Sequence, residues 1–210
     1  FALSGNKLFL NKNGTQALSV EHQWFEPGSK GWGWGAAFFD YENDGDEDVY
    51  ITNGYVSDSL SGDQANQFYI QSNQKFFKSA DKKPESFIGN SRSVAAIDFT
   101  NTGKLDLLIN NFDTPPVLLK NRNKSKNNWI KIKLEGTKNK FGIGAVVKVF
   151  VKNTPIQSKL VSCGSGYLSQ EDTSLTFGIG RNSEIKKIVV IWPGNHQQII
   201  KGPIKANQLI

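Results

Sequence analysis

A strand, a polar loop and a second strand occur twice in this chain, 58 residues apart. The first copy spans residues 36–53 and the second spans residues 94–111, and the two align without a gap. In each copy, short apolar β-prone runs flank a loop that begins with Asp and carries Gly at its sixth position. A repeat of this kind predicts β-sheet units that bury their faces against one another.

Further similarity extends each copy of this repeat. Residues 6–10 resemble residues 66–70, and residues 116–120 form a third, weaker copy of the same element. We therefore expect residues 1–123 to hold about two units of four short strands each, as in the blades of a β-propeller. Two blades cannot close a ring, so preceding blades would be missing from the sequence or supplied by another chain. The chain starts at Phe1 without Met, which predicts a removed leader or a piece of a longer protein.

The whole chain has the pattern of an all-β protein. It holds 210 residues, of which 38% are hydrophobic and 20 are Gly, and it has no long helical period. Residues 130–134 alternate apolar and basic side chains, which predicts a strand with one solvated face, whereas the apolar run 188–192 predicts a strand buried on both faces. We predict a partial β-propeller over residues 1–123 and a small β-sandwich over residues 124–210.

The first of the two loops, residues 40–48, is strongly acidic. It contains six of the nineteen acidic residues, although the formal net charge of the protein is +6. Carboxylates this close together repel unless a cation neutralises them, and Ca²⁺ takes six to eight oxygen ligands. We predict a Ca²⁺ site, with the main-chain carbonyl of Asp46 as an additional ligand. The predicted metal ligands are Asp40, Glu42, Asp44, Asp46 and Asp48.

The spacing matches only the first half of an EF-hand loop. Acidic residues stand at positions 1, 3 and 5, Gly45 stands at position 6, and Ile51 stands where an EF-hand has a bidentate Glu. β-prone runs rather than helices flank the loop, so we expect it to join two strands, with Asp48 closing the shell. The alternative is a solvated acidic turn.

The second loop, residues 98–106, keeps only part of this pattern. Thr100, Thr102 and Lys104 stand where the first loop has Glu42, Asp44 and Asp46. Because Ca²⁺ affinity depends on the number of charged ligands, we interpret the second loop as a structural turn.

These residues carry a resemblance to two known families. Residues 40–54 resemble the FG-GAP or VCBS calcium-binding repeat of integrin-type propellers, apart from Glu42, where that repeat usually has Asp. The rest of the chain resembles the ASPIC/UnbV domain, as in cartilage acidic proteins and their bacterial relatives, and this resemblance implies a propeller that precedes the domain. The ASPIC/UnbV motifs are Asn128–Ile130, Gly142–Val147, Gly164–Gln170, Phe177–Gly180 and Val190–Gly194.

Two further segments are candidates for ligand binding. The polar loop 164–170 could line a ligand site through Tyr167, Ser169 and Gln170, although a loop that satisfies its local backbone is the favoured interpretation. The aromatic glycine run, residues 31–35, serves either blade packing, which is favoured, or an exposed platform on which a sugar stacks.

Little in the sequence indicates an enzyme. His22 and His196 lack companions at metal-ligand spacing, and we expect each to be a surface or satisfied histidine. Cys163 is the only cysteine, so no internal disulfide forms, and a small buried thiol is the default expectation. We predict a non-catalytic protein; the alternative is a piece of a propeller enzyme.

The remaining expectations concern partners and compartment. Eight cationic residues between Lys120 and Lys140 form either a solvated linker or a basic seam for anionic polysaccharide, lipid headgroups or, least favoured, nucleic acid. No apolar run is long enough to span a membrane. Ca²⁺ sites of this kind fill where calcium is millimolar, which predicts an extracellular, periplasmic or cell-surface location.

Together these features predict a calcium-stabilised interaction or adhesion module with a protein or polysaccharide partner. The alternative is a scaffold subunit of a larger envelope or extracellular assembly, in which a partner completes the propeller.

Overall fold

The computed structural model of the protein describes residues 7–20, 24, 31–55, 64–79, 88–164 and 166–210. These residues form seventeen β-strands. The protein is therefore all-β, as predicted, and within the described residues its strands form several separate sheets rather than a closed barrel. His22, Asn6 and Ser165, which entered the predictions above, lie outside the described residues.

The first repeat unit is a four-stranded antiparallel sheet. Its strands are β3 (Gly33–Phe39), β4 (Asp48–Asn53), β6 (Gln67–Ser72) and β7 (Lys75–Lys78), in that order. All six positions of β4 are buried, because apolar clusters cover both faces of the sheet. A strand covered on both faces explains why its sequence reads as a continuous β-prone run.

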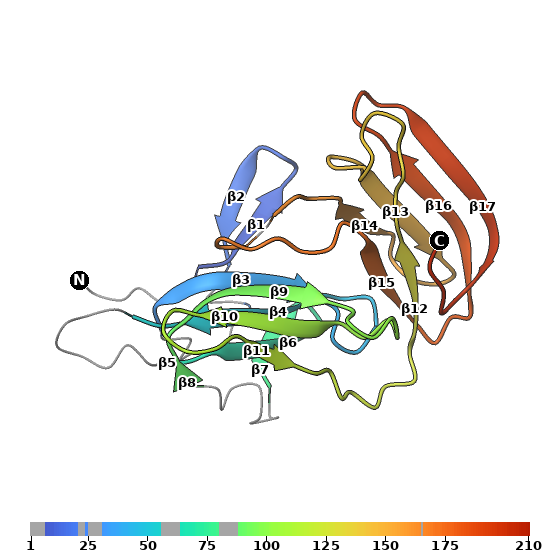
Figure 1. Ribbon diagram of the computed structural model, residues 1–210. Coiled ribbons are helices and arrows are strands. Elements are labelled where there is room, and N and C mark those ends of the chain that lie inside the picture. Colours follow the sequence, from blue (N-terminus) through green and yellow to red (C-terminus); the bar gives the residue numbers. More distant parts are fainter. Residues whose placement is uncertain (1–6, 21–23, 25–30, 56–63, 80–87, 165) are drawn as a thin grey trace.

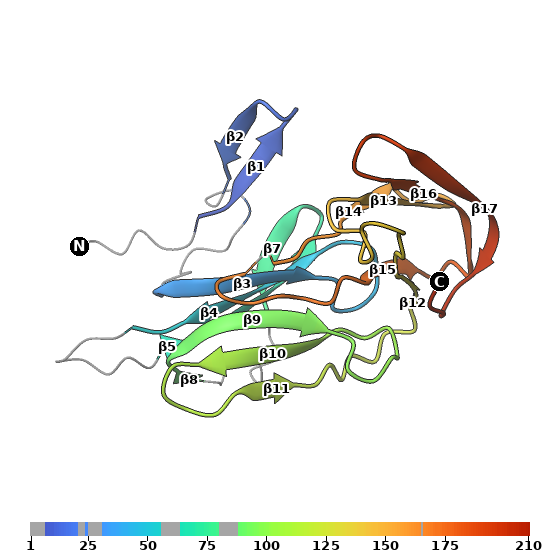
Figure 2. The ribbon, with the colours of Figure 1, turned by 45° about the horizontal axis from the view of Figure 1, so that its top comes forward.

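The second repeat unit packs against the first. It consists of β9 (Ser91–Ile97), β10 (Asp106–Asn111) and β11 (Val117–Leu119) in an antiparallel sheet, next to β3 of the first unit (Figure 2). One core joins the two units. Its buried members are Ala37, Phe39, Tyr50, Phe68, Val94, Leu107 and Ile109.

Two smaller pairs complete the N-terminal part. The hairpin β1 (Phe9–Lys12) and β2 (Gln16–Ser19) is exposed along its whole length and projects from the rest in Figure 1. The strands β5 (Gln64–Ala65) and β8 (Ile88–Gly89) form a two-residue antiparallel ladder.

The C-terminal part contains two sheets around one core. One sheet pairs β12 with β15, and the other has the order β14-β13-β16-β17. These strands are β12 (Asn128–Ile132), β13 (Val146–Val151), β14 (Gln157–Leu160), β15 (Leu175–Gly180), β16 (Glu184–Ile191) and β17 (Gln197–Lys205). Residues of both sheets, such as Ile130, Phe177, Val149 and Ile188, lie in a single buried cluster, as when two sheets pack face to face.

The burial of β12 differs from the prediction. Lys131 was expected on a solvated face but is only 8% exposed, and its ammonium lies 3.6 Å from the carboxylate of Asp172. The C-terminal residues of the chain explain the difference, because the backbone of Lys131 pairs with Gln208 and Ile210. The predicted burial of the apolar run 188–192 is confirmed at Ile188, Val189 and Val190, whereas Ile191 and Trp192 are half-buried.

No helix among the described residues has the length and apolar character needed to cross a lipid bilayer.

Candidate metal centre

The acidic loop, residues 40–48, connects β3 to β4, so the prediction that it joins two strands is confirmed. Asp40 shapes the loop. Its Oδ1 accepts the backbone N–H of Asp44 at 3.0 Å, and its Oδ2 accepts that of Gly45 at 2.8 Å. Asn43 and Gly45 have positive φ values of 58° and 102°, a conformation that Asn and Gly adopt most readily.

The second loop has the same backbone geometry. Oδ1 and Oδ2 of Asp98 accept the N–H groups of Thr102 and Gly103 at 2.9 and 2.8 Å. Asn101 and Gly103 have φ values of 53° and 74°. The two loops therefore fold alike although their charges differ.

The ninth position also has a backbone role in both loops. Asp48 accepts the N–H groups of Tyr41 and Gln71 at 2.7 and 2.9 Å, and Asp106 accepts the N–H of Asn121 at 2.7 Å. Asp at positions 1 and 9 thus accepts backbone hydrogen bonds that hold the conformation of both loops. The carboxylates that the second loop lacks are those of Glu42, Asp44 and Asp46, together with that of Glu47, whose place is taken by Leu105.

Three polar atoms of the acidic loop, two of them from these carboxylates, are unsatisfied. Glu42 Oε2, Asp46 Oδ1 and the amide oxygen of Asn43 are buried without a hydrogen-bond partner. A buried oxygen without a partner costs on the order of 1–3 kcal/mol, more if it is charged, so native proteins rarely leave several in one loop. A cation bound by these oxygens would offset that cost.

The pKa values of the loop rise for the same reason. Burial, and next the Glu42 carboxylate, raise the pKa of Asp48 to about 9. Burial is also the main cause that raises the pKa of Asp40 and of Asp46 to about 7, with the Asp44 carboxylate adding to it. The pKa of Glu42 is raised by burial and then by Asp44. Without a cation the loop therefore favours protonated carboxyl groups.

Few basic side chains compensate the loop. Among the described residues its ion pair joins Lys159 Nζ to Glu47 Oε1 at 2.9 Å.

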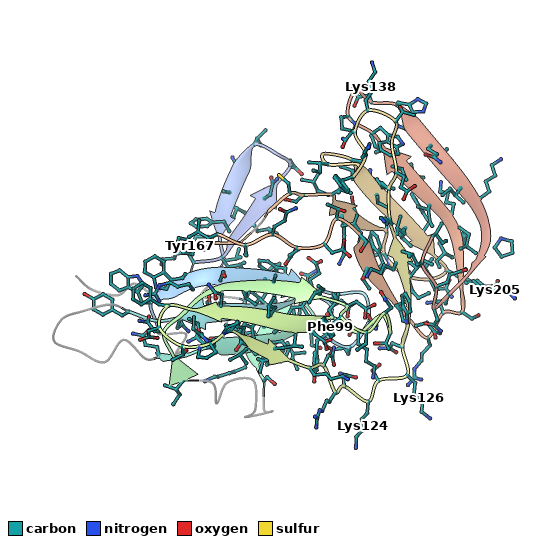
Figure 3. The ribbon with its side chains drawn as sticks, in the orientation of Figure 1. Phe99, Lys124, Lys126, Lys138, Tyr167 and Lys205 are labelled. Carbon is teal, nitrogen blue, oxygen red and sulfur yellow. The ribbon has the colours of Figure 1, made fainter. Side chains whose placement is uncertain are left out.

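In the segment between β11 and β12, Lys124 and Lys126 are exposed and point outward in Figure 3. Asn121 and Asn127 of that segment instead donate to the carbonyls of Tyr41 and Glu42, at 2.9 and 3.0 Å. The segment binds the loop's backbone and leaves its carboxylates uncompensated. Its exposed cations fit both the solvated linker and the basic seam considered above, so the choice between them stays a prediction.

The donor set suits a hard cation because it consists only of oxygens. Within the described residues, however, no three Asp, Glu, His or Cys side chains already converge as a metal cage. The carboxyl groups of Glu42 and Asp48 are within hydrogen-bonding reach, and Asp44 is exposed. Closing a shell would require side-chain rotation at Asp44 and its neighbours, with the backbone already in place.

Both loops rest on the C-terminal sheet formed by β12 and β15. A Cβ atom added at Gly178 would lie 2.1 Å from Oδ2 of Asp40, and one added at Gly103 would lie 2.0 Å from the Trp129 ring. The N–H of Gly180 donates to the Asn43 carbonyl at 3.0 Å, and the Asn43 amide donates to the Gly103 carbonyl at 3.0 Å. The acidic loop is therefore the joint between the two parts of the protein.

This joint was not predicted from the sequence. The partners of the acidic loop on the far side, Asn127, Gly178 and Gly180, lie at least 79 residues further along the chain. The only available signal was that Trp129 and Gly178 belong to two of the ASPIC/UnbV motifs.

The three residues of the second candidate site, Tyr167, Ser169 and Gln170, have different environments in the structure. Tyr167 packs on Trp34 with ring centroids 5.1 Å apart, whereas Ser169 donates to the Val94 carbonyl at 3.2 Å and Gln170 is exposed. The favoured interpretation, a loop that satisfies its local backbone, is wrong for Ser169, because its acceptor is 75 residues away in β9.

The remaining candidates lie on the surface. His196 is exposed, as expected for a surface histidine. Cys163 is exposed rather than buried, because it follows β14 in a loop instead of standing in a strand.

Comparison with known proteins supports the assignment of the C-terminal part. Residues 135–210 match the family described as ASPIC and UnbV. Over 108 residues, half of this chain, the sequence is 29% identical to cartilage acidic protein 1 of Xenopus tropicalis and 27% identical to that of Mus musculus.

These relatives are much longer than the chain, since the matches cover 16% and 17% of their lengths. The family match begins after β12, so the Asn128–Ile130 motif lies outside it. Residues 135–210 therefore resemble an ASPIC and UnbV domain.

Proposed function

We propose that the acidic loop binds Ca²⁺ and that the protein is a non-catalytic, calcium-stabilised interaction module. The observation that carries this proposal is the set of buried carboxylate oxygens without partners, at Glu42 and Asp46, in a loop whose backbone is already folded by Asp40 and Asp48. The resemblance of this loop to the FG-GAP or VCBS repeat supports the same assignment.

Each ligand has a separate task in this proposal. Glu42, Asp44 and Asp46 supply the negative charge that attracts the ion, because the second loop folds without their counterparts. Asp40 and Asp48 add oxygens while they keep their backbone hydrogen bonds. The bound ion supplies positive charge that lowers the carboxylate pKa values and holds the loop rigid.

A rigid loop matters because it lies between the two parts of the protein. The contacts of Asn43 with Gly180 and of Glu42 with Asn127 link the acidic loop to the C-terminal part. Calcium would fix this joint and thereby fix the relative position of surfaces contributed by both parts. We propose that these surfaces bind a protein or polysaccharide outside the cytoplasm, at the cell surface, in the periplasm or in the extracellular space, where Ca²⁺ is abundant.

The test is a calorimetric titration of chelator-treated protein with Ca²⁺, accompanied by melting curves. The key variant is Glu42→Thr/Asp44→Thr, which places in the first loop the residues that the second loop carries at the same positions. We expect one site in the parent protein, a melting temperature that rises with Ca²⁺, and loss of both in a variant that still folds. Absence of binding by the parent at millimolar Ca²⁺ would refute the calcium role.

A specific observation favours a second candidate, a scaffold whose partner completes the propeller. Leu108 and Leu118 are opposite each other on β10 and β11, and both are nearly half exposed, as is expected of a blade whose next neighbour is missing. Light scattering of the purified protein tests this candidate. A concentration-dependent assembly that Leu108→Lys disrupts would support the scaffold. A stable monomer would argue against self-assembly through this face and favour the interaction module that acts alone.

A further inference from the structure

An aromatic pocket lies at the opposite end of β3 from the acidic loop. It has a volume of about 700 Å³, within the usual range for small-molecule sites. Trp34 and Asp40 are six residues apart on an extended strand, which separates the two sites by roughly 20 Å. The residues that define the aromatic pocket are Trp32, Trp34, Tyr55, Arg92, Phe112 and Tyr167.

Both parts of the protein build this pocket. Trp34 is the second residue of β3, and Arg92 lies in β9. Tyr167 belongs to the loop between β14 and β15 of the C-terminal part, which reaches the two repeat units (Figure 3). The hydroxyl of Ser169 holds that loop on the Val94 carbonyl at 3.2 Å. Leu168, at the tip, is 86% exposed with φ at 48°, so this loop displays an apolar side chain from an unfavourable backbone conformation.

Arg92 places a positive charge among the rings. Its guanidinium lies 4.5 Å from the Trp34 ring centroid and 5.2 Å from that of Phe112. Nη1 donates to Asn90 Oδ1 and to the Ser91 carbonyl, at 2.5 and 3.0 Å. Within the described part of the chain no carboxylate pairs with Arg92, and its Nε and Nη2 donors have no acceptor. These donors fit the two oxygens of a carboxylate.

The rings are arranged for a ligand that is not planar. Trp34 and Tyr167 are inclined by 56°, and Trp32 and Tyr55 are inclined by 49°. Inclined walls do not form a slot for a flat base, whereas a pyranose ring can place its C–H groups on one aromatic face while its hydroxyls point elsewhere. Ser93 and the exposed Asn110 supply polar groups for such hydroxyls.

We propose that the aromatic pocket binds a saccharide that carries a carboxylate, a hexuronic acid unit, with the acid on Arg92 and the sugar ring against Trp34 and Tyr167. A cationic ligand is disfavoured by Arg92, and the single cation suits one anionic group rather than a polyphosphate. This inference rests on the interaction role proposed above, and it is independent of the calcium site because the two share no residue.

The experiment titrates the protein with oligomers of galacturonic acid, with their methyl esters and with adenosine monophosphate. The methyl ester keeps the sugar and removes the charge. We expect saturable binding of the acid, about tenfold weaker binding of the ester, and no competition by the nucleotide. Equal affinity for acid and ester, stronger binding of the nucleotide, or no saturable binding of the acid would overturn the proposal.

Variants at exposed positions locate the site without disturbing the fold. Tyr167 is 40% exposed and Phe112 is 64% exposed, so Tyr167→Ala and Phe112→Ala should keep the parent melting temperature while they weaken acid binding about tenfold. Arg92→Gln should remove the preference for acid over ester. Ile199→Ala, at an exposed position of β17 outside the pocket, is the matched control and should bind as the parent does. Parent-like binding by Tyr167→Ala would overturn the assignment.

A calcium titration of Tyr167→Ala keeps the two proposals distinguishable. Unchanged calcium binding with lost saccharide binding supports the aromatic pocket as a separate site. If the parent binds saccharide but no Ca²⁺, the calcium role fails and the pocket stands.

Discussion

Trp129 and Gly178 face each other across β12 and β15, and each of them supports one of the two Asp loops. Gly178 lies under Asp40 and Asn43 of the acidic loop, while the Trp129 ring lies against Gly103 of the second loop. The sheet therefore contacts two structurally equivalent loops in different ways. The large side chain of Trp129 packs against the second loop, and the absence of a side chain at Gly178 leaves room for the acidic loop. This pairing explains why a glycine stands in the interior of β15, where it would otherwise weaken the strand.

Gly178→Ala is expected to destabilise the protein by about 2 kcal/mol. The new Cβ would lie 2.4 Å from Cα and 2.5 Å from the carbonyl carbon of Asn43, and backbone atoms cannot move aside cheaply. Chemical denaturation measures the effect. Gln197→Ala, at an exposed position of β17, is the control and should change the free energy of unfolding by less than about 0.5 kcal/mol. A Gly178→Ala protein as stable as the parent would contradict the close packing of the joint.

Asp98→Ala and Asp40→Ala should differ in their response to calcium. Each change removes the acceptor of two backbone hydrogen bonds, so each should lower the free energy of unfolding by about 2–3 kcal/mol in chelator. In Ca²⁺, Asp98→Ala should keep the parent's gain in stability, whereas Asp40→Ala should lose most of it. Melting curves with and without Ca²⁺ measure both. Equal calcium responses in the two variants would argue against a separate role for the acidic loop.

The stability of the calcium-free protein should fall as the pH rises. The folded-state pKa values of Asp48, about 9, and of Asp40 and Asp46, about 7, lie above the unfolded value of about 4. Between these limits the folded state binds more protons than the unfolded state, so the stabilisation is complete below about pH 4 and is lost through pH 7–9. Melting temperatures in chelator at several pH values test this slope.

Saturating Ca²⁺ should flatten the same curve, because the ion replaces the protons at the loop. Glu42→Thr/Asp44→Thr should flatten it in part without calcium, since fewer carboxylates then raise one another's pKa while burial still raises the pKa of Asp40, Asp46 and Asp48. A calcium-free parent that becomes more stable between about pH 5 and pH 8 would contradict the pKa directions.

The repeat and the acidic loop were accessible from the sequence because both are local. The alternation of β-prone runs and turn residues predicted β3, β4, β9 and β10 and placed the loop between strands. Local spacing also revealed which carboxylates the second loop lacks.

The joint and the aromatic pocket could not be predicted in this way. They depend on contacts between segments far apart in the chain, such as Asn127 with Glu42 and Tyr167 with Trp34. Lys131 and Ser169 were misjudged for the same reason, since their partners, Asp172 and Val94, come from other elements. Periodicity reports how a strand alternates but not what later covers it.

A buried polar chain between the two repeat units gives a further prediction, at Ser91. The Asn66 amide donates to Ser91 Oγ at 3.0 Å, and Ser91 Oγ donates to Asn111 Oδ1 at 2.9 Å, all three residues being buried. Ser91→Ala would leave a donor and an acceptor unsatisfied and should cost about 2–4 kcal/mol, because both groups are far from water. Ser72→Ala, at an exposed position of β6, is the matched control. If denaturation shows equal stabilities for the two variants, solvent reaches the chain and the units are held by their apolar core alone.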